Sequence, residues 1–206
     1  MPEGLPDFSD GFDVYAGWEI ARKGDNSLTP EQNRLLAYGA PLFLYNDDNV
    51  DSLESTAGTD TLKEMLEEWW EVTDRKSALE TISWLLNEGQ HAGADPALTE
   101  IRQRGIEAIT EEEKADEDSK IGDAFTIAEF VMGVNETTEA DLPETVLAWD
   151  FVRAVNMARW AFICGYINED EMWEAIRTTA GIAKESFNSW EEYGNSFAAV
   201  SYTHLT

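Results

Sequence analysis

The sequence has little of several features that would indicate where a protein works. It has one cysteine, Cys164, so no disulfide can form within the chain, and we expect a reduced, cytoplasmic setting. It has no run of about 18 apolar residues, which argues against a membrane-spanning helix. Its first seven residues lack the basic start and the apolar centre of a secretory signal peptide.

Basic residues are also scarce. Lys and Arg number 14 against 42 Asp and Glu, which gives a net charge of -28. Such a surface repels nucleic-acid phosphates and anionic membranes. Two interpretations are open: a solvated acidic coat that keeps the protein soluble, or a surface that binds a partner with a basic face, such as a cationic toxin or a DNA-binding protein.

Motifs for catalysis and cofactor binding are missing. The sequence has no phosphate-binding loop, dinucleotide-binding glycine motif, zinc-ligand spacing or Gly-x-Ser-x-Gly nucleophile elbow. Asp47, Asn49 and Asp51 have the spacing that begins a calcium-binding loop. The sixth position of that loop, however, is Ser52 in place of Gly, and the twelfth is Gly58 in place of Glu. We therefore expect no metal and no cofactor.

The last seven residues, 200–206, read VSYTHLT. They match one translated reading frame of the transposon end and adapter used to prepare sequencing libraries. We interpret 200–206 as adapter-derived, expect the gene fragment to run into adapter near Ala199, and leave the segment out of the fold prediction. His204 lies in that segment, so His91 is the only histidine considered further.

The remaining composition favours a folded, mainly α protein. The chain has 206 residues, of which 43% are hydrophobic, enough for a domain with a real core. Apolar residues recur at helical spacing, whereas alternating strand patterns are scarce. We predict an N-terminal arm over 1–28 and one compact multi-helix domain over 29–199. A minor short strand pair, or a buried loop, is the alternative near Leu42–Tyr45.

Capping residues indicate where several helices begin. Thr29 and Asn168 each precede Gln or Glu by three residues, the spacing of a capping box. Asp141 has the same relation to Glu144, so we predict a central helix from Asp141 to Cys164. Asp95-Pro96 is the predicted start of an earlier helix.

Polar residues lie at regular intervals among the apolar residues of the central helix. Asp150 and Arg153 are three apart, so they can form an ion pair. One interpretation is a structural pair that fixes how helices dock, because an isolated buried charge is costly. The other is a polar pocket in which Arg153 binds an anion and Asp150 orients it or acts as a base. The candidate ligand-binding residues of that pocket are Asp150, Arg153, Asn156, Tyr166 and His91.

Two other features have both a structural and a functional explanation. His91 follows the helix predicted over 75–88, where it can stack against the negative end of that helix; the alternative is a ligand or a catalytic group. Four tryptophans recur at helical spacing, which favours places in the core over a ligand platform. They are Trp149, Trp160, Trp173 and Trp190.

Several short stretches resemble a known bacterial family. The first half contributes Trp70-Glu71-Val72 and Glu88-Gly89-Gln90-His91. The second half is matched more tightly, by Ala148-Trp149-Asp150, Arg153, Arg159-Trp160, Gly165-Tyr166-Ile167, Trp173 and Ser189-Trp190-Glu191. Over roughly 70–197 the sequence is similar to the family called domain of unknown function 1266 (DUF1266). This resemblance implies a shared fold and no particular chemistry.

Two classes of function follow from the sequence. The favoured one is a cytoplasmic interaction module that binds or neutralises a basic partner, because the chain is acidic and lacks catalytic motifs. The alternative is a small enzyme or an anion-binding protein with its site around Asp150, Arg153 and Tyr166.

Overall fold

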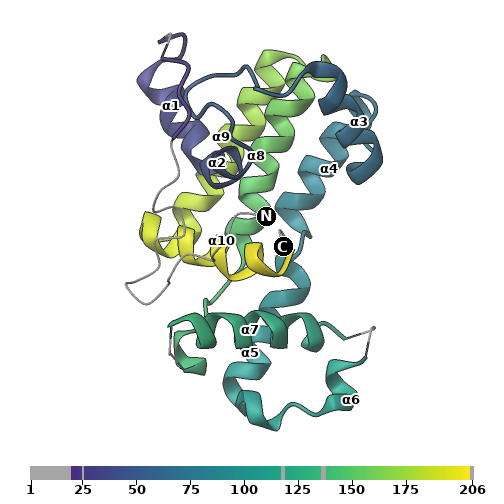
Figure 1. Cartoon of the computed structure of the whole chain (residues 1–206), viewed down its shortest axis with the longest axis vertical. Coiled ribbons are helices and arrows are strands. Elements are labelled where there is room, and N and C mark those ends of the chain that lie inside the picture. The colour runs from purple at the N-terminus through teal and green to yellow at the C-terminus, as the bar shows by residue number, and fades with distance from the viewer. Residues whose placement is uncertain (1–19, 25, 117–118, 136–137, 205–206) are drawn as a thin grey trace, which may run out of the picture.

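The computed structural model describes residues 20–24, 26–116, 119–135 and 138–204. All regular structure in these ranges is helical, so the predicted mainly α fold is confirmed (Figure 1). The segment for which a strand was the alternative forms helix α2 (Ala40–Tyr45), because Pro41 fits a first helical turn and the helix buries Leu42 and Phe43 together. Most of the predicted arm over 1–28 lies outside the described residues.

Loops and short 3-10 turns join the helices. Besides α2, they are α1 (Pro30–Leu36), α3 (Thr59–Trp70), α4 (Arg75–Asn87), α5 (His91–Arg104), α6 (Glu111–Lys114), α7 (Ile121–Asn135), α8 (Leu147–Ile163), α9 (Glu169–Ser186) and α10 (Trp190–His204). The predicted capping boxes at Thr29 and Asn168 are present at the starts of α1 and α9. Both side chains accept the N–H of the third helical residue, which stabilises these helix starts.

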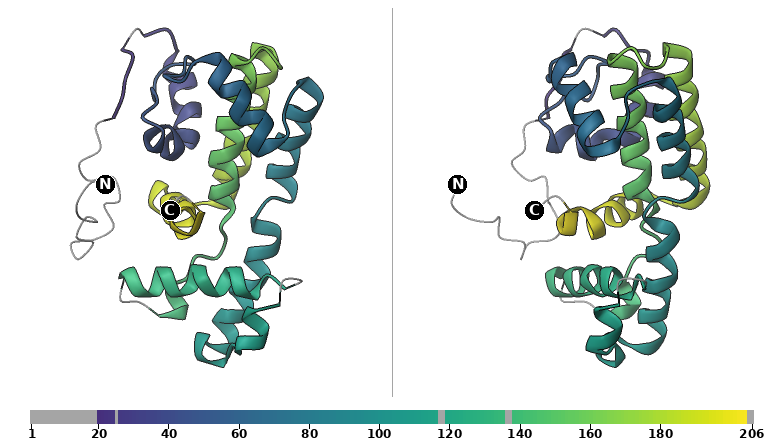
Figure 2. Two further views of the ribbon diagram at one scale, coloured as in Figure 1. Left: turned by 45° about the vertical axis from the view of Figure 1, so that its right-hand side comes forward. Right: turned by 90° about the vertical axis from the view of Figure 1, so that its right-hand side faces the viewer.

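Helix α8 is the centre of the fold. Every residue from Ala148 to Ala161 is buried except Arg153, which is partly buried. Helix α8 contacts α2, α4, α5, α9, α10 and the 3-10 turn Ala37–Gly39 (Figures 1 and 2). Because apolar residues lie on all sides of α8, it requires neighbours on all sides, and this explains why the other helices surround it.

The predicted start of this central helix at Asp141 is wrong. Residues Glu139–Asp141 form a separate 3-10 turn, and Asp141 accepts the N–H of Thr138. The chain then passes Leu142 and Pro143 in a non-helical path before α8 begins at Leu147. Asp141 is therefore the third residue of the capping box that Thr138 begins, not a cap itself. A residue from another helix caps α8, as described below.

Helices α5, α6 and α7 form a layer beyond one end of the α8–α9 pair (Figure 2). Helix α7 contacts both α5 and α10, which links this layer to the rest of the molecule. Helix α5 begins at His91, so the predicted start at Asp95-Pro96 is wrong and Pro96 lies inside the helix. Pro96 lies in the second turn of α5, where it has no N–H to donate to the carbonyl of Ala92.

Three of the four tryptophans predicted to be in the core are buried: Trp149, Trp160 and Trp173. Trp190 is 56% exposed, so the prediction is wrong for this residue. It is the first residue of α10, and its ring lies on that of Tyr38, 4.7 Å away, at the edge of the core.

Helix α10 continues beyond Ala199. It runs through Val200, which is fully buried, to His204, and so includes most of the segment that we interpret as adapter-derived. Among the described residues, no helix combines the length and the hydropathy needed to cross a bilayer.

Candidate functional site

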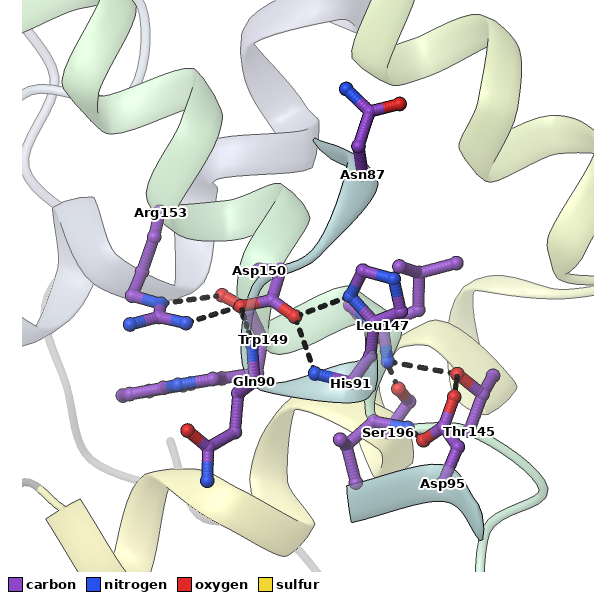
Figure 3. Close-up of polar contacts among 12 residues, drawn as sticks. Asn87, Gln90, His91, Asp95, Thr145, Leu147, Trp149, Asp150, Arg153 and Ser196 are labelled. Atoms are coloured by element: carbon purple, nitrogen blue, oxygen red, sulfur yellow. Dashed lines mark hydrogen bonds and ion pairs between the residues drawn. The ribbon is translucent and has the colours of Figure 1, made fainter. Parts of the chain in front are cut away.

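Asp150 is the most highly connected polar residue of α8. Its side chain is fully buried, and its Oδ1 and Oδ2 accept the backbone N–H groups of Gln90 and His91 at 3.0 and 2.9 Å (Figure 3). These N–H groups open α5 and have no partner within that helix. A carboxylate is also favoured by the positive end of a helix dipole. Asp150 of α8 therefore caps α5.

His91 contributes its side chain to the same carboxylate. Its Nδ1 lies 2.7 Å from Oδ2 of Asp150, and its side chain is 17% exposed. The predicted stacking of His91 against the end of the preceding helix is wrong, because His91 opens the next helix and is turned toward Asp150. Since a carboxylate only accepts hydrogen bonds, Nδ1 of His91 is the donor.

Arg153 completes the group around Asp150. Its Nη2 forms the ion pair with Asp150 that the spacing predicts, and its Nε donates to the carbonyl of Trp149 at 3.4 Å. The guanidinium also lies over the rings of Trp149 and Trp70, 4.9 and 5.7 Å from their centroids. Burial lowers the pKa of Arg153, and the neighbouring Asp150 acts in the opposite direction.

The capping between α5 and α8 is reciprocal. Asp95, one turn into α5, accepts the backbone N–H of Val146 at 2.8 Å and the hydroxyl of Thr145 at 2.6 Å. Val146 is the residue that precedes α8. Burial raises the pKa of Asp95, while the bonds from Thr145 and Val146 counteract this rise. Each helix thus uses an aspartate to satisfy the N-terminus of the other (Figure 3).

The close approach at this junction requires a glycine. Gly89 has a φ of +44°, in the left-handed region, and a Cβ at this position would lie 2.5 Å from Cγ of Asp150. A side chain would therefore both strain the backbone and push the carboxylate away from Gln90 and His91.

Asn156 and Tyr166 are not part of this group. The amide of Asn156 donates to the carbonyls of Gly39 and Val152 at 3.0 and 2.8 Å, so it holds the turn Ala37–Gly39 against α8. Tyr166 lies beyond the opposite end of α8, roughly 20 Å along the helix from Asp150. Of the five predicted residues, the structure brings together Asp150, Arg153 and His91.

A second buried ion pair was not predicted from the sequence. Arg159 is fully buried, and its Nη1 lies 2.9 Å from Oδ2 of Asp48. Its Nη2 donates to the carbonyl of Glu54, and its guanidinium lies 4.5 Å from the Phe43 ring centroid. Burial lowers the pKa of Arg159, and Asp48 counteracts this effect. An arginine among the apolar residues of a central helix requires a carboxylate partner, but the sequence does not show which Asp or Glu supplies it.

Two hollows lie beside Arg153. The first, which we call the tryptophan cleft, has a volume of about 710 Å³ and is lined by Glu68, Trp69, Trp70, Glu71, Glu80, Thr81, Trp84 and Arg153. The second, which we call the loop cavity, has a volume of about 440 Å³ and lies between α3, α8 and the loop that follows α2. Trp69, Trp70 and Arg153 line both hollows.

Polar residues around the helix junction are occupied by structural bonds. The two oxygens of Asp150 receive two backbone N–H groups, an imidazole and a guanidinium. This arrangement favours the structural interpretation of the Asp150–Arg153 pair over a general base at Asp150. Among the described residues, no group of three or more His, Cys, Asp or Glu side chains has the geometry to hold a metal ion.

Comparison with known proteins gives one match. No curated protein and no solved structure matches the chain. The profile of one family, described as protein of unknown function (DUF1266), matches residues 65–204. The match begins in α3 and includes both partners of the α5–α8 junction and every residue that lines the tryptophan cleft. Since it covers more than half of the chain, this protein belongs to the DUF1266 family.

Proposed function

We propose that this protein is an interaction module that binds a basic partner through the tryptophan cleft. The observation that carries the proposal is a pair of exposed tryptophans among carboxylates on α3 and α4. Trp69 is 77% exposed and Trp84 is 42% exposed, and both line the cleft. Large aromatic side chains left in water are typical anchors of protein interfaces.

The charges around these tryptophans favour a cationic group. Glu68 and Glu71 have no basic partner among the described residues, and Glu80 has only an exposed pair with Lys76 at 3.5 Å. Arg153 lies in the cleft, but Asp150 offsets its charge. A lysine or arginine from a partner can lie over an indole face while it reaches a carboxylate.

The backbone at Glu71 supports the same proposal. Glu71 ends α3 with a φ of +55°, in the left-handed region. Glycine is the usual residue at such a position because it adopts this conformation without a steric cost. A glutamate here is less stable than a glycine would be, and strained positions of this kind gather at functional sites.

The charge of the whole chain also favours a basic partner. A net charge of -28 attracts a cationic protein over a long range and repels nucleic acids and anionic membranes. We place this interaction in the cytoplasm, since the chain has a single cysteine and that thiol is buried.

Calorimetric titration with a short lysine- and arginine-rich peptide tests the proposal. A chain this acidic binds such a peptide weakly at many places, so the comparison must remove that background. Glu68→Gln/Glu71→Gln is compared with Glu107→Gln/Glu112→Gln, which removes the same charge from exposed residues outside the cleft. Trp84→Ala is compared in the same way with Trp190→Ala, which removes an exposed tryptophan elsewhere.

We expect the two cleft variants to weaken binding clearly more than their matched controls. Binding by the unaltered chain should also weaken as salt rises, because the screening length falls from roughly 10 Å at 0.1 M to about 3 Å at 1 M. Equal losses in the cleft variants and in the controls would show only diffuse attraction and would overturn the proposal.

A further inference from the structure

The loop cavity is a second hollow with different chemistry. Its walls are Leu42 of α2, Met65 and Trp70 of α3, Ala57 of the intervening loop, and Trp149 and Trp160 of α8. Its volume of about 440 Å³ lies in the range of pockets that hold small organic ligands. Indole walls of this kind favour a flat, apolar ring, because stacked or edge-to-face contacts with aromatic groups are favourable.

The wall formed by the loop is fixed in place before any ligand arrives. Arg159, which is fully buried, donates to the carbonyl of Glu54 and pairs with Asp48. Asp48 in turn accepts the hydroxyl of Ser55 at 2.9 Å and the backbone N–H of Thr56 at 2.9 Å. A preformed wall lowers the entropy cost of binding, so the cavity can bind a ligand without first ordering the loop.

Arg153 supplies a hydrogen-bond donor to the cavity. Its Nη2 and Nε are used by Asp150 and by the carbonyl of Trp149, whereas its Nη1 has no hydrogen-bond partner among the described residues. The side chain is 15% exposed, so water satisfies Nη1 less well here than at the surface. A guanidinium presents its N–H groups in a fork that fits a carboxylate.

Among the residues that the structure describes, Asp48 is the only carboxylate that lines the cavity, and it is already satisfied. Asp48 is 3% exposed and accepts three hydrogen bonds besides its pair with Arg159. It therefore offers little to a cationic ligand, whose charged group would lose its hydration in the cavity without gaining an acceptor. A ligand that complements this site has an aromatic ring for the indole walls and an acceptor oxygen for Nη1 of Arg153.

We propose that the loop cavity binds a small aromatic carboxylate, with its ring against Trp70 and Trp160 and its carboxylate at Arg153. This proposal does not rest on the basic partner, because it concerns a separate hollow and the opposite charge. The two sites share Trp69, Trp70 and Arg153, so a ligand in the cavity also contacts residues that line the tryptophan cleft.

Three probes of similar shape and different charge test the proposal: indole-3-acetate, indole and tryptamine. Each is titrated calorimetrically into the full chain. We expect indole-3-acetate to bind about tenfold more tightly than indole, the factor that one charge-assisted hydrogen bond contributes. Tryptamine should bind more weakly than indole. Equal affinities for the three probes, or a preference for tryptamine, would overturn the proposal.

Two variants locate the binding. Arg153→Lys keeps a cation beside Asp150 but removes Nη1, so it should lower the affinity for indole-3-acetate to near that of indole. Ala57→Phe fills the cavity and should abolish binding of indole-3-acetate and of indole. Ala115→Phe is the control: it lies at the end of α6, outside the cavity, and should leave both affinities unchanged. Circular dichroism verifies that each variant is folded.

The outcomes distinguish this site from the tryptophan cleft. Trp84 lines the cleft and not the cavity, so Trp84→Ala should leave the affinity for indole-3-acetate unchanged. Undiminished binding of indole-3-acetate to Ala57→Phe would show that the probe binds elsewhere, and the assignment to the loop cavity would then be wrong.

Discussion

Oδ2 of Asp150 lies 2.9 Å from the backbone nitrogen of His91 and 2.7 Å from its Nδ1. One carboxylate on α8 thereby binds both the main chain and the side chain of the first residue of α5. Together with the reverse contact from Asp95 to Val146, it fixes the layer that contains α5 to the centre of the fold. The polar residues at this junction serve first to join helices.

Asp150→Ala should therefore be strongly destabilising. It leaves Arg153 without its counter-ion and the first N–H groups of α5 without an acceptor. Breaking one partner of a buried pair costs about 3–5 kcal/mol. Urea unfolding measures this change in free energy. Asp123→Asn, which removes one partner of an exposed pair with Lys120, should change stability by less than about 0.5 kcal/mol. Similar small losses for both variants would contradict the capping role.

Gly89→Ala tests the close approach at the same junction. The left-handed φ of Gly89 and the short distance that would separate an added Cβ from Asp150 both oppose a side chain. We expect a loss of more than about 2 kcal/mol in unfolding free energy. Gly181→Ala is the matched control, because a Cβ there meets open space within α9. It should stabilise the protein by about 0.5–1 kcal/mol. Equal effects of the two substitutions would rule out a specific role for Gly89.

A double-mutant cycle on Asp48 and Arg159 measures the second buried pair. Asp48→Asn and Arg159→Met should each be strongly destabilising, and their effects should not add, with a coupling of order 2 kcal/mol. The pair of Arg104 and Glu113, which lies at the surface, is the reference cycle and should couple more weakly, because water screens it. Additive effects at Asp48 and Arg159 would mean that the pair does not fix the loop to α8.

The pH dependence of stability should reveal the partly buried carboxylate of Asp95. Burial raises its pKa in the folded state above the ordinary value of 3.8. The folded protein therefore binds this proton more tightly than the unfolded chain does, so the contribution of Asp95 is largest below about pH 3.8 and is lost as pH rises through its folded pKa. The melting temperature of Asp95→Asn should be closest to that of the unaltered chain at low pH. As the pH rises, the variant should become more stable relative to the unaltered chain. A difference independent of pH would contradict this assignment.

Glu113 should show the opposite dependence. Hydrogen bonds from Arg104 and Thr110 lower its pKa to about 2, from an ordinary value of 4.5. Its contribution to stability is therefore present above about pH 4.5 and is lost as pH falls toward 2. Glu113→Gln should be less stable than the unaltered chain at pH 6, and the two melting temperatures should converge as the solution is acidified. If the two melting temperatures still differ at low pH, the hydrogen bonds lost in Glu113→Gln do not depend on the charge of Glu113.

Local patterns in the sequence predicted the features that depend on neighbouring residues. The capping boxes at Thr29 and Asn168 and the pair of Asp150 with Arg153 each join residues that are three positions apart. The dense apolar residues within the α8 segment likewise indicated a central helix. These features depend on helix geometry alone, which the sequence determines directly.

The features that the sequence did not predict join distant parts of the chain. Asp48 and Arg159 are 111 positions apart, and Asp150 caps a helix that begins 59 residues earlier. The start of α5 at His91 depends on that distant cap, whereas the local pattern pointed to Asp95. The exposure of Trp190 likewise depends on where α10 crosses Tyr38.

Glu71→Gly tests most directly the claim that the tryptophan cleft is kept for binding at a cost in stability. Glycine relieves the left-handed conformation and removes a carboxylate from the cleft. We predict that unfolding free energy rises by about 1 kcal/mol, while calorimetric affinity for the basic peptide falls by more than in Glu107→Gln. A variant that gains stability and binds the peptide as tightly as the unaltered chain would contradict this claim.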